Sequence, residues 1–359
     1  MKVNTVKAIN FRSFDEAEAG LTSFTILIGK NGTGKSSLIQ AITTSLGITQ
    51  FNKMSDSRKA GGLSLEVDIG IFEEEKEDVL SSYGEAIASY DIKGARTYLD
   101  HVWAGKPVHL HYSLLDSADQ VSPIFTNNDK ADNILLGQMQ QLQPRQGNRN
   151  IRASFNALVQ NYVKKHILFL PEAREIPSSF APNYANLSDF GNHILNMKLN
   201  DRERYLEFED LARTIVPEFS DVLVHINQGS AALGFRERAM ARELFVQNIS
   251  KGTREVLLML DALVSSPKGS VILIEEPEIH LYPQAVKKLK AKMKEYVERK
   301  QLQIILSTHS AIFLQDIDPT QDSTFRFLSF TKDENGVCRF RSVTEDREID
   351  EMISDMTYI

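Results

Sequence analysis

One stretch near the start of the chain has the residue types and the spacing of a loop that binds phosphate. Residues Gly29–Ser36 read GKNGTGKS and fit the pattern G-x-x-x-x-G-K-[ST] in full. Glycines let the backbone curl so that several N–H groups point at one anion, and the positive N-terminal end of a following helix adds to the attraction. A chance match is expected in only about 1% of chains of this length. We therefore predict a site for a nucleoside triphosphate.

The polar side chains of this loop predict how it holds the nucleotide. Lys35 can reach the β- and γ-phosphates, and the hydroxyl of Ser36 can hold Mg²⁺. The residues expected to bind the nucleotide here are Asn31, Gly32, Thr33, Gly34, Lys35, Ser36 and Ser37. The loop alone does not distinguish a kinase, a GTPase, a helicase or an ABC-type ATPase.

A second group of reactive side chains follows a short apolar run. The four apolar residues 271–274 predict a buried strand, and Glu275 and Glu276 come directly after it. The carboxyl ends of parallel strands open onto the ligand crevice, so these carboxylates can face Mg²⁺ and the γ-phosphate. Glu275 suits the Mg²⁺ shell, and Glu276 suits a base or an orienting group for the attacking water. A strand that merely ends in solvated acids is the alternative, and the phosphate loop in the same chain favours the catalytic interpretation.

The strands and helices expected around these motifs alternate along the chain. Apolar runs predict strands at residues 3–6 and 9–11, 23–28, 63–71, 108–114, 166–170, 221–226, 231–235, 271–274, 303–307, 325–330 and 337–343. Helical spacing of apolar residues predicts helices at 36–46, 73–104, 185–217, 253–264, 284–299 and 347–356. Strands that alternate with helices at both ends of the chain imply an α/β core with a partly parallel sheet.

The segment that begins with the two acids resembles that of a known family. Glu275–Pro283 reads EEPEIHLYP and is similar to the Walker B segment of OLD-like ATPases, which are ABC-type ATPase heads related to SMC and RecF-type heads. The family pattern is approximately E-E-P-E-x-H-L-H-P, and Tyr282 stands where a second histidine is common. Ile9–Phe14, INFRSF, also resembles the start of these heads. The resemblance covers about residues 1–50 and 165–330 and implies ATP and Mg²⁺ as cofactors.

The resemblance implies a signature motif before the Walker B strand. Ile249–Arg254, ISKGTR, resembles the LSxGT form of the family, and Ser250 is a suitable N-cap for the apolar helix that follows. In ABC-type heads the signature of one subunit caps the ATP bound to the Walker A loop of another. Ser250 and Gly252 are then expected to contact the nucleotide of a second copy, which implies a homodimer around ATP. A capped helix without a ligand is the alternative.

Two further elements of the family are expected at the ends of strands. Leu306–Ser310, LSTHS, matches the segment of the switch histidine, so the resemblance assigns His309 a catalytic role beside Glu276 and Lys35. A histidine packed in a loop is the alternative. Leu170–Arg174, LPEAR, occupies the place of the Q-loop but contains no glutamine, and Glu172 or Arg174 could serve instead.

The motifs and elements together predict the fold class and its division. We expect an α/β P-loop ABC-type ATPase head with a mixed, partly parallel sheet and an α+β insertion. Residues 1–50 and 165–359 are expected to form one discontinuous ATPase domain. Residues 51–164 form the insertion, with a mobile stretch near 115–150, where the sequence is polar and rich in turns.

The work that the ATPase cycle drives is open on the sequence alone. Some OLD proteins carry a Toprim nuclease, but the Asp-x-Asp pair at 316–318 lies before Pro319 in an expected turn, with little chain beyond it. We therefore expect a separately encoded effector, as in the antiphage defence systems that such heads resemble. A DNA-repair or chromosome-maintenance ATPase of the RecF or SMC type is the alternative. A nucleotide-gated scaffold with little turnover is another.

Composition excludes several classes of protein. The chain has 359 residues, 42% of them hydrophobic and 25% charged, which argues against disorder. No apolar run approaches the ~20 residues of a membrane span. The single cysteine, Cys338, excludes an intrachain disulfide and a thiolate zinc site, and no signal peptide is visible. We expect a cytoplasmic protein that does not bind a membrane.

Nucleic-acid binding is open as well. The net charge of −7 argues against a basic surface overall but not against a local basic patch. One basic helix contains Lys287, Lys288, Lys290, Lys292, Lys294, Arg299 and Lys300, and a second cluster contains Arg145, Arg149 and Arg152. A solvated helix face is the favoured interpretation, because Glu295 and Glu298 lie among these cations, and contact with DNA is the other.

Overall fold

The protein folds into two compact units. The computed structural model describes residues 1–49, 57, 62–81, 108–115, 124–126, 161–172, 187–227, 230–240, 242–317 and 322–357. The first unit comprises Met1–Thr22, Gly29–Ile167 and Ser329–Arg341, and the second comprises Ser23–Ile28, Leu168–Leu328 and Ser342–Ile359. The division expected from the sequence, with an insertion at 51–164, stays a prediction. Residues 116–123 and 127–150 of the expected mobile stretch lie outside the described residues.

The first unit contains a five-stranded antiparallel sheet in the order β2-β1-β4-β5-β6. Its strands are β1 (Lys2–Phe11), β2 (Phe14–Gly20), β4 (Ser64–Ile71), β5 (Val108–Leu115) and β6 (Ile124–Thr126). Helix α1 (Lys35–Ser45) packs against β1 and β4, and the short helices η1 (Glu73–Glu75) and α3 (Lys76–Ser81) follow β4. The sequence analysis missed β2, in which only Phe14, Ala17 and Ala19 are buried.

A six-stranded sheet has the order β14-β13-β3-β12-β11-β7, and its strands β3, β7, β11 and β12 lie mainly in the second unit. Its strands are β3 (Phe24–Gly29), β7 (Ile167–Leu170), β11 (Val271–Glu275), β12 (Gln303–Thr308), β13 (Phe325–Lys332) and β14 (Cys338–Val343). Strands β3, β12 and β11 are parallel. All residues of β11 and β12 are buried, as the apolar runs predict. The expected α/β fold with a mixed, partly parallel sheet is confirmed.

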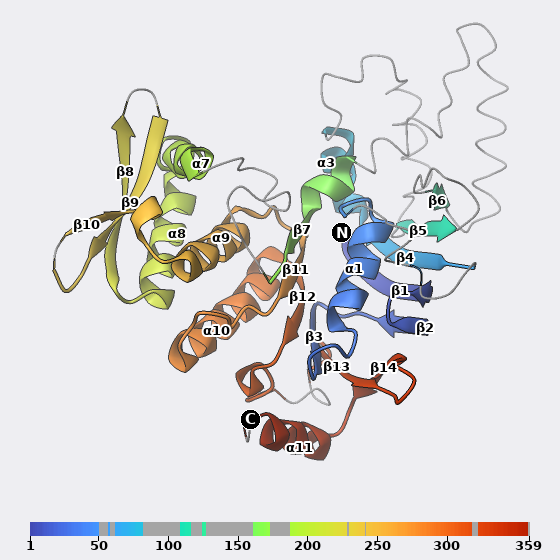
Figure 1. Cartoon of the computed structure of the whole chain (residues 1–359). Helices are drawn as coiled ribbons and strands as arrows, with labels where there is room; N and C mark the ends of the chain where they lie inside the picture. The colour runs from blue at the N-terminus through green and yellow to red at the C-terminus, as the bar shows by residue number, and fades with distance from the viewer. Residues whose placement is uncertain are drawn as a thin grey trace, which may run out of the picture. The chain divides into compact units, whose positions relative to one another are not determined.

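Helices and a small antiparallel sheet complete the second unit (Figure 1). The helices are α7 (Leu187–Asn200), α8 (Arg202–Ile215), η3 (Val246–Asn248), α9 (Lys251–Ser265), α10 (Pro283–Lys300), η4 (Ala311–Phe313) and α11 (Asp346–Thr357). The small sheet has the order β10-β9-β8, formed by β8 (Phe219–Asn227), β9 (Ser230–Glu237) and β10 (Glu243–Phe245). The hydroxyl of Tyr205 donates to the carbonyl of Val222 at 2.8 Å, which fixes α8 against β8. No helix in the described part of the chain is long and apolar enough to span a membrane.

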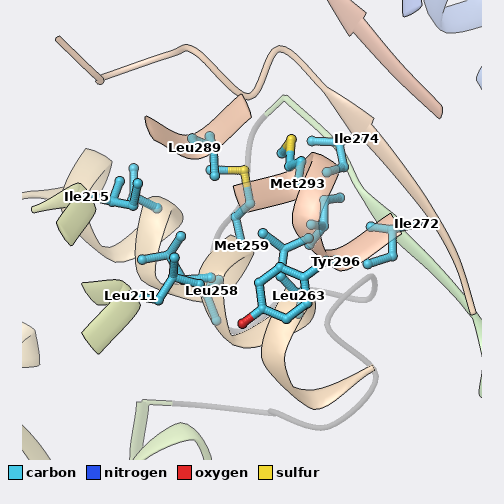
Figure 2. Packing of buried hydrophobic residues seen from close by; sticks show 14 of the residues in the cluster. Leu211, Ile215, Leu258, Met259, Leu263, Ile272, Ile274, Leu289, Met293 and Tyr296 are labelled. Carbon is cyan, nitrogen blue, oxygen red and sulfur yellow. The ribbon is translucent and has the colours of Figure 1, made fainter. Parts of the chain in front are cut away.

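The core of the second unit holds the predicted catalytic strand in place. Helices α8, α9 and α10 lie side by side and turn their apolar faces toward one another and toward β11 (Figures 1 and 2). The buried side chains that meet there include Leu211, Ile215, Leu258, Met259, Leu263, Ile272, Ile274, Leu289, Met293 and Tyr296. Because residues of α8, α9, α10 and β11 belong to one buried cluster, the core holds β11, and with it Glu275 at the end of the strand, in position.

Truncation of this core should cost stability. Leu263 on α9 is fully buried, so Leu263→Ala removes packed methyl groups and leaves a cavity, which we expect to lower the free energy of unfolding by about 2–5 kcal/mol. Leu206→Ala on α8 is the matched control, because that side chain is 46% exposed, and its change should stay within about 0.5 kcal/mol. Urea denaturation followed by circular dichroism measures both, and equal midpoints for the two variants would contradict the packing described.

Candidate functional site

The residues expected to handle the nucleotide belong to both units. Residues Gly29–Ser37 lie in the first unit. The acids after β11, the switch histidine and the signature lie in the second unit. Within the second unit, Glu276 and His309 come into direct contact, and the signature helix begins beside His280.

The phosphate-binding loop is held in a curled form by its own side chains. The ammonium group of Lys35 is buried and donates to the carbonyls of Gly29 at 2.7 Å and Lys30 at 3.1 Å. The Thr33 hydroxyl also donates to the Lys30 carbonyl, at 2.8 Å. Helix α1 starts directly after Gly34, so its free N–H groups lie at the end of the loop. This is the geometry of an anion site at a helix N-terminus.

The loop also rests on a support within the first unit. Gly34 has φ +103°, and a Cβ atom there would lie 2.9 Å from Cβ of Cys338 and 3.0 Å from Oγ of Ser13. The Cys338 thiol contacts the carbonyl of Gly32 at 3.6 Å, and the Ser13 hydroxyl donates to Ser37 Oγ at 3.0 Å. Position 34 therefore requires glycine, because its backbone angle is left-handed and because a Cβ atom would have no space. The INFRSF segment supports the loop through Ser13.

In the second unit, the register of three parallel strands brings the predicted motifs to one edge of the sheet. Ile28 at the end of β3 pairs with Thr308 at the end of β12, and Ser307 of β12 pairs with Glu275 of β11. The chain after β12 carries His309, and the chain after β11 carries Glu276. The residue that follows Ile28 is Gly29, the first residue of the phosphate-binding loop.

Glu275 has the surroundings of a ligand for a hard cation. Its side chain is buried at the end of β11, and one carboxylate oxygen accepts the backbone N–H of Glu172 at 3.3 Å. The segment after β7 thus reaches Glu275. Its role as the Q-loop equivalent stays a prediction, and Arg174 lies outside the described residues. A carboxylate fits the oxygen chemistry that Mg²⁺ requires. Among the residues that the structure describes, no group of three or more His, Cys, Asp or Glu side chains is placed to bind a metal by itself.

Glu276 and His309 form a pair that is suited to proton transfer. Nε2 of His309 lies 3.1 Å from Oε1 of Glu276, and both side chains are partly exposed. Glu276 has φ +47°, and its N–H donates to the carbonyl of Ser307 at 2.9 Å. A left-handed conformation is uncommon for a residue other than glycine and is found where the surrounding structure enforces it. Here it turns the chain sharply after β11, next to the end of β12.

Glu278, for which the sequence predicts no role, contacts the loop that carries His309. Its Oε1 accepts the hydroxyl of Thr308 at 2.7 Å and the backbone N–H of His309 at 2.7 Å. Glu278 therefore fixes the loop that carries the switch histidine. The only sequence signal was its place in the EEPE run, because the partners lie 30 and 31 residues further along the chain.

The far side of this loop is held by α10. The ammonium group of Lys290 donates to the carbonyls of Ile312, at 3.1 Å, and of Gln315, both beyond His309. Burial lowers the pKa of Lys290 to about 8, and the nearby Asp316 opposes this shift. The loop around His309 is thus fixed from two sides.

The signature lies at the start of α9. Ser250 is the N-cap that the sequence predicted: its Oγ accepts the N–H of Thr253 at 3.1 Å, and its hydroxyl is exposed. Beside it lies a pocket of about 400 Å³, lined in part by Ser250, Thr253 and Tyr282. The Tyr282 side chain is 74% exposed. The Ser250 hydroxyl also lies 2.8 Å from Oγ1 of Thr253. An exposed N-cap serine at a helix N-terminus can bind an anion.

Comparisons with known proteins agree with this architecture. A family model described as "AAA domain, putative AbiEii toxin, Type IV TA system" matches residues 24–315. The fold is similar to that of an SMC head bound to the C-winged helix domain of ScpA, with a TM-score of 0.61 and 12% identity over 97% of this chain and 100% of that chain. It is also similar to an Smc head with an extended coiled coil, bound to the C-terminal domain of ScpA derived from Pyrococcus furiosus. That comparison gives a TM-score of 0.55 and 12% identity over 98% and 99% of the two chains. None of the curated proteins matches.

The role of Glu278 can be tested by its removal. Glu278→Ala leaves the buried Thr308 hydroxyl and the His309 N–H without their acceptor, which should cost about 1–3 kcal/mol of stability. Hydrogen exchange at the His309 amide should become faster. Glu278→Gln is the matched control, because it keeps an acceptor oxygen at the same place. If the alanine variant protects this amide as well as the glutamine variant does, Glu278 does not hold the loop.

Proposed function

This chain belongs to the family of AAA domains described as the putative AbiEii toxin of a type IV TA system, and on that premise we propose that it is a Mg²⁺-dependent ATPase. The family and the head fold make it an ATP-binding domain of the AAA type. Hydrolysis is the proposal. The observation that supports it most directly is the register of β3, β12 and β11, whose carboxyl ends lead into the phosphate-binding loop, His309 and Glu276.

Binding would begin at the phosphate-binding loop. The N–H groups of the loop and of the first turn of α1 receive the phosphates, and Lys35 exchanges its two carbonyl acceptors for phosphate oxygens. The hydroxyl of Ser36 and the carboxylate of Glu275 would hold Mg²⁺, which neutralises charge on the phosphates when it is bound. The exchange costs little, because Lys35 donates hydrogen bonds before and after.

Hydrolysis would depend on the pair of Glu276 and His309. The Glu276 carboxylate accepts a proton from the attacking water, and His309, 3.1 Å away, keeps the carboxylate oriented. Glu278 acts on this step indirectly, since it fixes the backbone of His309. The three side chains come from two neighbouring strand ends, so their spacing is set by the sheet.

Glu276→Gln separates binding from turnover. The amide cannot accept a proton from water, so we expect ATP hydrolysis to fall at least about 100-fold while ATP still binds. Phosphate release and the binding of a fluorescent ATP analogue measure the two effects. Lys35→Ala is the comparison variant and should lose binding itself. Hydrolysis at the wild-type rate in Glu276→Gln would refute the assignment of Glu276, and a wild-type protein without turnover would favour the nucleotide-gated scaffold.

The signature supports a homodimer around ATP. Ser250 and the start of α9 form an anion site, and the adjoining pocket and the exposed Tyr282 form a surface that a second copy could cover. One nucleotide would then contact the Walker A loop of one copy and Ser250 and Gly252 of the other. ATP would close the dimer, and hydrolysis would open it.

The dimer can be tested with protein that binds ATP but turns over slowly. Glu276→Gln should be monomeric without nucleotide and dimeric with ATP and Mg²⁺ when its mass is measured by light scattering. A second change, Ser250→Arg, places a long cation at the contact and should abolish the ATP-dependent dimer. Ser81→Arg, at an exposed serine of α3, is the matched control and should leave it intact. ATP-dependent dimers of the Ser250→Arg protein would refute the role of the signature.

We extend the proposal to a separate effector protein that the ATP cycle controls, in antiphage defence. The support is the resemblance of residues 275–283 to OLD-like heads and the family description, which names a putative toxin. The two similar SMC heads are each bound to a part of ScpA, so heads of this fold can carry a protein partner. Affinity purification of Glu276→Gln with and without ATP tests the idea, because a controlled effector should bind in one nucleotide state only.

The alternative role in DNA repair or chromosome maintenance gains little from the basic helix. Helix α10 carries seven cations that could form a DNA-binding face. Six of them contact acceptors within the second unit. Their partners are Thr214 for Lys288, Ile312 for Lys290, Glu295 for Lys292, Asp322 for Lys294, Glu207 for Arg299 and Val264 for Lys300. These contacts favour a structural role for the helix. Arg145, Arg149 and Arg152 lie outside the described residues.

A further inference from the structure

The signature helix is in tight contact with the segment that follows the catalytic acids. A Cβ atom built on Gly252 would lie 2.5 Å from Cγ of His280 and 2.6 Å from its Cβ. The imidazole of His280 therefore occupies the space that any other side chain at position 252 would need. His280 itself has φ +66°, a conformation that histidine adopts more often than most residues but that the surroundings must enforce.

A second contact joins His280 to the same helix. Nε2 of His280 lies 3.5 Å from Oε2 of Glu255, one turn further along α9. The Glu255 side chain is only 4% exposed, whereas the His280 side chain is about half exposed. Lys251 also approaches Glu255, at 4.0 Å. His280 thus contacts the first two turns of α9 at Gly252 and at Glu255.

The other end of the same segment carries the proposed base. Residues 276–281 form a turn in which the Ile279 N–H donates to the Glu276 carbonyl at 3.2 Å and the Leu281 N–H donates to the Glu278 carbonyl at 3.0 Å. Glu276 and His280 have left-handed backbone angles at its two ends. A turn fixed by internal hydrogen bonds moves as one piece, so a displacement at Glu276 is carried to His280.

We propose that His280 is a positioning residue that sets the orientation of Ser250 by packing on Gly252 and pairing with Glu255. The inference rests on the proposed ATPase function and deepens it, since it links the hydrolytic acid of one nucleotide to the signature that serves the other. It also gives Gly252 a different reason to be glycine: the position must admit the ring of His280, whether or not a phosphate approaches its backbone.

A set of three variants tests the contact between Gly252 and His280. Gly252→Ala introduces the colliding Cβ, and His280→Gly removes the ring at a backbone angle that glycine accepts. The double variant removes both partners. We expect Gly252→Ala to lower kcat and the melting temperature of the nucleotide-free protein. The double variant should regain the melting temperature and only part of kcat, to about tenfold above that of Gly252→Ala, because it still lacks the ring of His280. Gly234→Ala is the matched control, because its nearest neighbours lie at 3.6 Å or more.

The outcomes separate this inference from the function on which it rests. A double variant as inactive as Gly252→Ala, or changes in melting temperature that are additive for the two substitutions, would overturn the contact.

His280→Asn then tests the positioning role, because asparagine tolerates the backbone angle but does not reach Glu255. We expect kcat to fall about tenfold while the affinity of the Walker A loop for ATP stays unchanged. Unchanged kcat would overturn the positioning role. If the wild-type protein does not hydrolyse ATP, the proposed function fails, and ATP-dependent dimerisation of His280→Asn, expected to be weaker than wild type, replaces kcat as the measure.

Discussion

The parallel pairing of β3, β12 and β11 is the constraint on which the candidate site depends. Parallel strands that are paired in register end at the same edge, and here the ends are Ile28, Thr308 and Glu275. Because the inner strands are buried on both faces, a slip in register would move polar strand ends into an apolar core, at a cost that the packing of α8, α9 and α10 makes large. The sheet thus sets the positions of the strand ends that carry the reactive residues. The short loops after each strand set the orientation of those residues.

The sequence predicted those parts of the structure that depend on local pattern. Buried strands such as β11 and β12 are continuous apolar runs, and Ser250 could be identified as an N-cap because capping depends on adjacent residues. Strand β2 was missed because its buried positions after Phe14 are two alanines among glutamates, a weak alternation. The role of Glu278 was missed because its partners are far away in sequence, and no local pattern reports a contact of that kind.

The turn after β11 combines strain with tight fixation. Two residues other than glycine, Glu276 and His280, have positive φ angles within five positions, and each such residue costs of order 1–3 kcal/mol. The hydrogen bonds of Glu278 to the loop of His309, and the packing of His280 on Gly252, offset this cost. Contacts on both sides of the turn hold its strained backbone. They thereby orient the side chains of the turn, because any relaxation of the backbone would break one of these contacts.

Helix α9 is held unequally along its length. The middle of the helix is locked in the core through Leu258, Met259 and Leu263, and a helix of 15 residues behaves as a rigid rod. A movement of the whole helix would therefore break core packing, which costs several kcal/mol for each large side chain displaced. Ser250 and Lys251 at its start are exposed and lie outside this core. A change that ATP hydrolysis produces near Glu276 should accordingly reach the exposed start of the helix through the ring of His280, while the body of α9 stays fixed.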